Sequence, residues 1–225
     1  MPATLFADLA GAAAACRAPP ASIRTQPFLH LVAALLPVLA ALGRGLAPAR
    51  ADVAKNLARL EAARTRAGGA LDADVRLLAS AELAAAGGDA DALDGSTAAK
   101  GLLWLVRTLA WVRGVVAGIA GTEGDSRPPS LTSVARDAYA STLRPFHGPL
   151  TGAAVSAALA FAPGRAAFWR AVAVGEGGGT DGGVTGGGPA AAAEVAAFLA
   201  AFDPTLADLQ AFLRETGLDD PTPVR

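Results

Sequence analysis

The sequence predicts an all-α protein that forms one domain over residues 1–225. Apolar residues make up 52% of the chain, and alanine accounts for much of this share. Leucine and valine recur among the alanines at three- and four-residue spacing, which favours helix over strand. No segment shows the alternating pattern of a half-buried strand. The length suits a single core, so we expect one helical domain.

Helical periodicity is interrupted by clusters of glycine and proline, which divide the chain into separate helices. The predicted helices span 3–16, 26–43, 49–67, 71–86, 97–120, 130–147, 149–161, 164–173 and 189–215. Pro204 is a point where the last of them could break, because proline cannot donate a helical hydrogen bond. Residues 175–188 are dominated by glycine, so we expect a flexible loop there and assign it no function.

Charge and cysteine content exclude several classes of protein. Nineteen basic and twenty acidic residues give a net charge of −1, so no broad positive field would attract nucleic acid. The single cysteine, Cys16, cannot form an internal disulfide, which fits a reducing compartment. The first residues lack the basic start of a secretion signal, whereas a transit peptide remains an open alternative. We expect a cytoplasmic protein without a nucleic-acid partner.

Three long apolar stretches raise the alternative of an integral membrane protein. They span residues 27–43, 101–121 and 148–163. The first contains His30 and Pro37, the second contains Arg107 and Arg113, and the third is too short to span a bilayer as a helix. We interpret all three as buried helices of a soluble domain.

The sequence offers little chemistry for catalysis. Its only histidines are His30 and His147, and it contains no HExxH, CxxC, GxSxG or Walker motif. An isolated histidine without a nucleophile motif is usually structural. We therefore expect no enzyme, no cofactor and no bound metal.

Polar residues recur on one face of the predicted helix 49–67. Asp52, Asn56 and Arg59 follow each other at i, i+4 and i+7, which places a carboxylate, an amide and a guanidinium together. Such a face suits a ligand-sized polar patch. The alternative is a solvated face that carries only an Asp52–Asn56 hydrogen bond.

Trp104 lies three residues before Arg107 in the predicted helix 97–120, so the two side chains share one side of it. The indole suits stacking on a ligand. The alternatives are core packing or a cation–π pair with Arg107.

Together these segments resemble the glycolipid transfer protein family, in the family's order and with roughly its spacing. Residues 27–57 contain a Phe-Leu start, a Leu-Pro, a Leu-Gly and the Asp-x-x-x-Asn signature. Residues 101–109 resemble the Leu-Trp-Leu-x-Arg helix, and 138–148 resemble the Ala-Tyr…Leu…His-Gly segment. The similarity continues through an Ala-Pro and a Phe-x-x-Ala pattern and is clearest over residues 27–173.

The resemblance implies a two-layer helical sandwich with an internal lipid-binding cavity and a polar head-group site at its mouth. It implies transfer of a sphingolipid between membranes, or binding of it, with a glycosylceramide as the favoured ligand. In this site Asp52 would accept from the lipid amide N–H and His147 would donate to its carbonyl. Asn56 and Arg59 would bind hydroxyls of the first sugar, and Trp104 would stack on the sugar ring.

Two prolines depart from the family pattern. Many members place a tryptophan where Pro149 stands, and that tryptophan helps them to dock on membranes. Without it, the side chain that docks on the membrane would be Trp111, Trp169 or Phe161. Core packing is nevertheless the favoured interpretation of each of these residues. Pro145 could kink the predicted helix 130–147 and displace the histidine two residues later.

Three alternatives remain at this point. One is a ceramide-1-phosphate transfer protein of the same fold, in which arginine replaces the stacking tryptophan and binds phosphate; Trp104 argues against it. A second is a glycolipid sensor or scaffold that binds without transferring. The third is the integral membrane protein, which the interrupted apolar runs disfavour. We expect a monomer that touches membranes transiently.

Overall fold

The computed structural model describes residues 4–19, 21–122, 125–173 and 189–219. The helices are α1 (Leu5–Cys16), α2 (Thr25–Ala34), α3 (Leu36–Ala41), α4 (Ala47–Arg66), α5 (Val75–Ala85), α6 (Ala98–Ala120), α7 (Leu131–Thr142), α8 (Pro149–Ala160), α9 (Arg165–Ala173) and α10 (Pro189–Glu215). Two 3-10 turns, η1 (Arg44–Leu46) and η2 (Arg144–Phe146), precede α4 and α8. The strands β1 (Arg17–Ala18) and β2 (Ser22–Ile23) form one short antiparallel pair.

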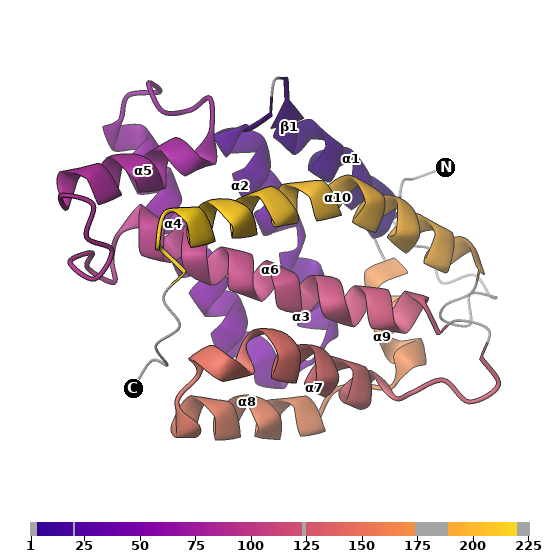
Figure 1. Cartoon of the computed structure of the whole chain (residues 1–225). Helices are drawn as coiled ribbons and strands as arrows, with labels where there is room; N and C mark the ends of the chain where they lie inside the picture. The colour runs from indigo at the N-terminus through magenta and orange to yellow at the C-terminus, as the bar shows by residue number, and fades with distance from the viewer. Residues whose placement is uncertain (1–3, 20, 123–124, 174–188, 220–225) are drawn as a thin grey trace.

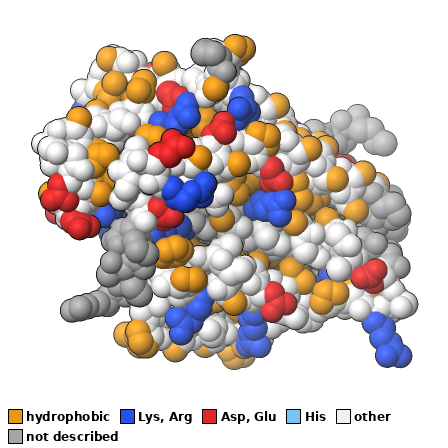
Figure 2. Space-filling view, in the orientation of Figure 1, with side chains coloured by type: hydrophobic (Ala, Val, Ile, Leu, Met, Phe, Trp, Pro, Cys, Tyr) orange, Lys and Arg blue, Asp and Glu red, His pale blue; other side chains and the backbone are white. Residues whose placement is uncertain are grey.

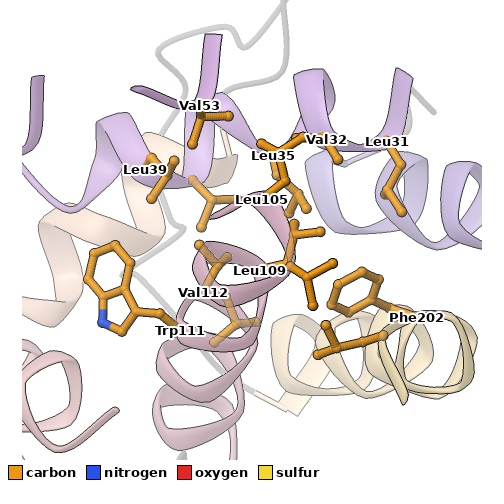
Figure 3. Close-up of a cluster of buried hydrophobic side chains, with 14 of the residues drawn as sticks. Leu31, Val32, Leu35, Leu39, Val53, Leu105, Leu109, Trp111, Val112 and Phe202 are labelled. Atoms are coloured by element: carbon orange, nitrogen blue, oxygen red, sulfur yellow. The ribbon is translucent and has the colours of Figure 1, made fainter. Parts of the chain in front are cut away.

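The helices form a two-layer sandwich, as the sequence predicts. In Figure 1, α10 and α7 flank α6, and α10 also packs along α1 behind it. Figure 3 shows the apolar interior, where side chains of α2, α3 and α4 face those of α6 and α10. Its members include Leu35, Val53, Leu105, Leu109 and Phe202, all of them buried. The core therefore lies between the two layers.

Among the residues that the structure describes, two helices are long and apolar enough to cross a membrane by length and composition. In α6, 61% of the most apolar window is buried inside the domain, which is the behaviour of a central core helix. The second, Ala190–Glu215 within α10, is 28% buried in its window and rests on α1 and α6 through buried Phe198 and Phe202. Both helices thus take part in packing the domain.

Prolines account for most differences between the predicted and observed helices. The predicted helix 26–43 is two helices, α2 and α3, which meet at Leu35. Pro37 lies in the first turn of α3, where a backbone N–H has no helical partner, so the chain restarts a helix there. At the other end of the chain, α10 continues through Pro204 without a break. Burial of Phe202 and Leu206 on either side stabilises the uninterrupted helix.

Three further predictions need correction or fall outside the described residues. The predicted helix 130–147 ends at Thr142, and His147 has an extended backbone after η2. The strands β1 and β2 were not expected, and two residues each are too few for an alternating pattern. The glycine-rich loop predicted at 175–188 lies outside the described residues.

The prediction of a buried helix over residues 148–163 is wrong, because most of α8 is exposed. Only Gly152 and Leu159 are buried in it, while Leu150 is 85% exposed and Phe161, just beyond its end, is 84% exposed. Core packing is therefore wrong for Phe161. It is confirmed for Trp111 and Trp169, which are 2% and 3% exposed. Alanine-rich sequence misled the prediction because alanine tolerates both environments.

Figure 2 shows no large patch of a single charge on the face formed by α10, α6 and α7. Basic and acidic side chains alternate there, and several are paired across helices. Arg113 of α6, for example, donates to both carboxylate oxygens of Asp203 of α10, with the shorter contact at 2.7 Å. This mixture agrees with the near-zero net charge of the sequence.

Candidate functional site

The polar face of α4 is present as a connected chain of hydrogen bonds. Asn56 Nδ2 donates to Asp52 Oδ2 at 3.0 Å, and a guanidinium N–H of Arg59 donates to Asn56 Oδ1 at 2.6 Å. Asp52 is exposed, whereas Asn56 is only 1% exposed. The alternative of a fully solvated face is therefore wrong for Asn56. Its amide fixes both neighbours in place and leaves the carboxylate of Asp52 facing outward.

On α6, Trp104 is half-buried and lies between two partners. Its indole stacks on the imidazole of His147, with ring centroids 5.8 Å apart and planes 19° from parallel. The guanidinium carbon of Arg107 lies 5.1 Å from the indole centroid and 3.5 Å from the Phe146 ring. The cation–π contact weighed as an alternative is thus present, together with a second aromatic contact. The residue as a whole remains partly exposed.

His147 ends η2 and contacts residues from three elements. Its Nδ1 lies 2.8 Å from the hydroxyl oxygen of Tyr139, which is on α7 and 3% exposed. Burial lowers the pKa of His147, and the positive charges of Arg144 and Arg107 act in the same direction against the opposing pull of Asp52. Burial also raises the pKa of Tyr139. At neutral pH the imidazole is therefore uncharged and the phenol protonated.

These contacts place all five predicted site residues in one region. Trp104 and His147 are in ring contact, and the carboxylate of Asp52 is close enough to affect the pKa of His147. Asn56 and Arg59 are bonded to each other and to Asp52. Pro145 lies within η2 and leaves the histidine beside the tryptophan, so the predicted displacement does not occur.

Gly101 permits the close approach of α4 and α6 beneath this site. A Cβ at Gly101 would lie 2.9 Å from Leu60 Cδ1 and 3.4 Å from the carbonyl oxygen of Asn56. Gly101 is also three residues before Trp104, on the same side of α6. Any larger side chain there would separate the amide and guanidinium of α4 from the indole.

We expect Gly101→Val to lower the free energy of unfolding by about 1–3 kcal/mol, because the added methyl groups overpack the α4–α6 contact. For a chain of this size the loss lowers the melting temperature by roughly 2–10 °C, which thermal denaturation followed by circular dichroism would measure. Gly11→Val is the matched control, since Gly11 also lies within a helix and a Cβ there meets nothing within 4 Å. Equal melting temperatures of the two variants would contradict the packing role of Gly101.

Tyr139 and Phe146 were not assigned a role from the sequence, and Arg107 was considered only as a cation–π partner of Trp104. Tyr139 fixes one nitrogen of His147, while Arg107 and Phe146 form a stacked pair beside Trp104. Tyr139 is the only tyrosine in the chain and lies in the same motif as His147, which was a usable signal. The contact could not be inferred, because eight residues separate them across a helix end and a 3-10 turn whose geometry the sequence does not specify.

We compared the sequence and the structure of this chain with those of known proteins. The model of the glycolipid transfer protein (GLTP) family matches residues 23–174, which include all five site residues. The chain belongs to the glycolipid transfer protein family. Glycolipid transfer protein 1 of Arabidopsis thaliana is 27% identical over 196 residues, covering 87% of this chain and 86% of that protein.

Two solved structures with the glycolipid transfer protein fold cover nearly the whole chain. The structure that shows how FAPP2 selects simple glycosphingolipids superposes with a TM-score of 0.81 and 24% identity, covering 99% of this chain and 100% of the other. Human ceramide-1-phosphate transfer protein in complex with 12:0 ceramide-1-phosphate gives a TM-score of 0.80 and 19% identity, with coverage of 95% and 97%. At these identities the likeness concerns the fold, and it confirms the predicted fold class.

Proposed function

We propose that this protein binds a single sphingolipid, a glycosylceramide, and transfers it between membranes without changing it chemically. The observation that carries the proposal is the partly exposed Trp104, which lies beside His147, together with the Asp52–Asn56–Arg59 chain of hydrogen bonds. Family membership supports the transfer of a lipid. The five residues supply the groups that a sugar and an amide need.

In this proposal the head group and the amide bind at the rim formed by α4, α6 and η2. The carboxylate of Asp52 accepts from the amide N–H, and His147 donates to the amide carbonyl. An amide left without partners in an apolar site would cost about 1–3 kcal/mol per group. Arg59 and Asn56 bind hydroxyls of the first sugar, while Trp104 stacks on its C–H face.

The two hydrocarbon chains enter the apolar region between the layers, which Figure 3 displays. The cavity there has a volume of about 10 Å³ and is lined by residues such as Leu35, Val53 and Leu109. This space holds about one water molecule, so chain entry requires the layers to separate. Burial in the protein and burial in a bilayer exclude similar apolar area from water, so uptake and release need no ATP.

Tyr139 acts in this proposal as a positioning residue for His147. A protonated phenol donates to Nδ1 of the neutral imidazole, which leaves the proton of the ring on Nε2, available to the lipid carbonyl. The tautomer is thus inferred from the protonation of both groups and not from observed hydrogens.

We expect Tyr139→Phe to slow glycosylceramide transfer by about fivefold, because the ring loses the partner that selects its tautomer. The ¹⁵N chemical shifts of His147 would report the tautomer directly. In the variant the Nδ1-protonated form should gain population at pH 7.5. An unchanged nitrogen spectrum combined with slower transfer would contradict the positioning role and leave only a packing effect.

Two further properties belong to the proposal. A soluble protein with one buried thiol, Cys16, whose pKa burial raises to about 12, suits the reducing cytoplasm. Transient membrane contact as a monomer is the second property. Leu150 and Phe161, at opposite ends of α8, are strongly exposed apolar side chains that could make this contact, and Leu150 lies three residues after His147.

Transfer between vesicles tests the function. Labelled glucosylceramide, ceramide-1-phosphate and phosphatidylcholine are followed from donor to acceptor vesicles with and without protein. We expect acceleration for glucosylceramide and none for phosphatidylcholine. Faster transfer of ceramide-1-phosphate than of glucosylceramide would favour that alternative ligand. A glucosylceramide complex in native mass spectrometry without accelerated transfer would instead identify a sensor or scaffold.

A further inference from the structure

Arg107 is a buried arginine that lies against the candidate head-group site. Its side chain is only 7% exposed, and its guanidinium carbon lies 5.1 Å from the ring centroid of Trp104 and 3.5 Å from that of Phe146. The same residue lines an open pocket of about 180 Å³ between α6, η2 and the end of α10. A charged group of a ligand bound at Trp104 would therefore come within electrostatic range of this arginine.

Asp219, which follows α10, supplies a carboxylate to this arginine. Its Oδ1 accepts from a terminal guanidinium nitrogen of Arg107 at 3.1 Å. The backbone holds the aspartate in place, because its N–H donates to the carbonyl oxygen of Leu213 at 3.0 Å and the neighbouring Leu218 is fully buried. Gly217 has a φ of 72°, a conformation that glycine adopts readily and that turns the chain after the helix. Figure 1 shows this end of α10 lying over the first half of α6.

We propose that Asp219 is a specificity-determining residue, whose carboxylate disfavours sphingolipids with an anionic head group. The inference rests on the proposed function and extends it to the choice between neutral and anionic ligands. A phosphate binds an arginine best where no other anion competes for the guanidinium. A phosphate that approached Arg107 would meet the Asp219 carboxylate at short range, and like charges repel strongly where burial limits screening. A sugar is uncharged and meets no such repulsion.

The other arginine of the site also has a carboxylate nearby. Arg59 donates to Asn56 Oδ1 at 2.6 Å. Hydrogen bonds from Ser96 and, to a smaller extent, the positive charge of Arg59 lower the pKa of Asp94, which lies in the loop before α6. Because negative charge accompanies both arginines, the site has less of the positive potential that would attract a phosphate.

The test compares Asp219→Asn with the wild type in the transfer of ceramide-1-phosphate and glucosylceramide between vesicles. Asparagine has nearly the same shape and keeps an acceptor oxygen for Arg107, so the substitution mainly removes the negative charge. We expect the ratio of ceramide-1-phosphate to glucosylceramide transfer to rise by about fivefold, because a phosphate no longer faces a like charge. Added salt should reduce this rise, because salt screens the repulsion.

Asp203→Asn is the matched control. Asp203 of α10 also pairs with an arginine of α6, at 2.7 Å from Arg113, and its side chain is 39% exposed against 36% for Asp219. Arg113 lies about 9 Å farther along α6 than Arg107, at 1.5 Å per residue. The control changes the net charge of the protein by the same amount and should leave the ratio unchanged.

The outcomes separate this inference from the proposed function. If the wild type transfers glucosylceramide but Asp219→Asn leaves the ratio unchanged, the specificity role is wrong while the function stands. An equal rise in Asp203→Asn would indicate a general effect of net charge, and an equal loss of transfer for both lipids would indicate a packing role; either result overturns the inference. If the wild type accelerates neither lipid, the proposed function fails, and the inference that rests on it fails as well.

Discussion

Asp52→Val is expected to lower the rate of glucosylceramide transfer by roughly tenfold to a hundredfold. The substitution removes the acceptor for the lipid amide N–H, and an unpaired amide group in an apolar site costs about 1–3 kcal/mol. Asp52 is exposed, so the change leaves the core intact, although Asn56 Nδ2 loses its partner at 3.0 Å. Transfer between vesicles measures the effect, and far-ultraviolet circular dichroism checks that the helices persist.

Two companion variants separate charge, hydrogen bonding and general surface effects. Asp52→Asn keeps an acceptor oxygen but removes the charge, so its transfer rate should lie between those of the wild type and Asp52→Val. Asp8→Val replaces another exposed helical aspartate, on α1 away from the site, and should leave transfer unchanged. Equal losses in Asp8→Val and Asp52→Val would remove Asp52 from the site.

Trp104→Ala is expected to reduce transfer by about tenfold, since the sugar loses its stacking surface. The indole also contacts His147 and Arg107, so the variant loosens two neighbours of the bound head group. Because Trp104 is half-buried and packs against the core, some loss of stability accompanies the change. Trp104→Phe retains a smaller ring and should recover part of the activity with a melting temperature near that of the wild type. Full activity of Trp104→Ala would contradict the stacking role.

The helical content and the polar face of α4 could be predicted from the sequence because both depend on local spacing. Asp52, Asn56 and Arg59 recur with the period of a helix, and that period alone aligned them on one side of α4. Bringing them to Trp104 and His147 required the family resemblance, because nothing in the spacing relates α4 to η2. Family membership supports that placement, and the roles of the five residues await the variants above.

Other features could not be predicted from the sequence because they depend on tertiary packing. The exposure of α8 follows from which neighbours cover it, and the sequence around Leu150 gives no sign that this side chain is 85% exposed. The continuity of α10 through Pro204 depends on burial of the residues around it, which overcomes the missing N–H. The pocket of about 180 Å³ lined by Arg107, Phe146 and Leu213 depends on three segments that are far apart in the chain.

Leu35, Val53 and Leu109 pack closely together between the two helical layers, and this packing affects the protein while it carries no lipid between membranes. The space between these apolar side chains is only about 10 Å³, so they contact one another across most of the gap. After the lipid has left, the protein therefore does not expose a large apolar surface to water, and such a surface would promote self-association. The two helical layers must then separate at a membrane, where hydrocarbon chains can fill the space between them. The rate of lipid uptake would therefore depend on the membrane as well as on the protein.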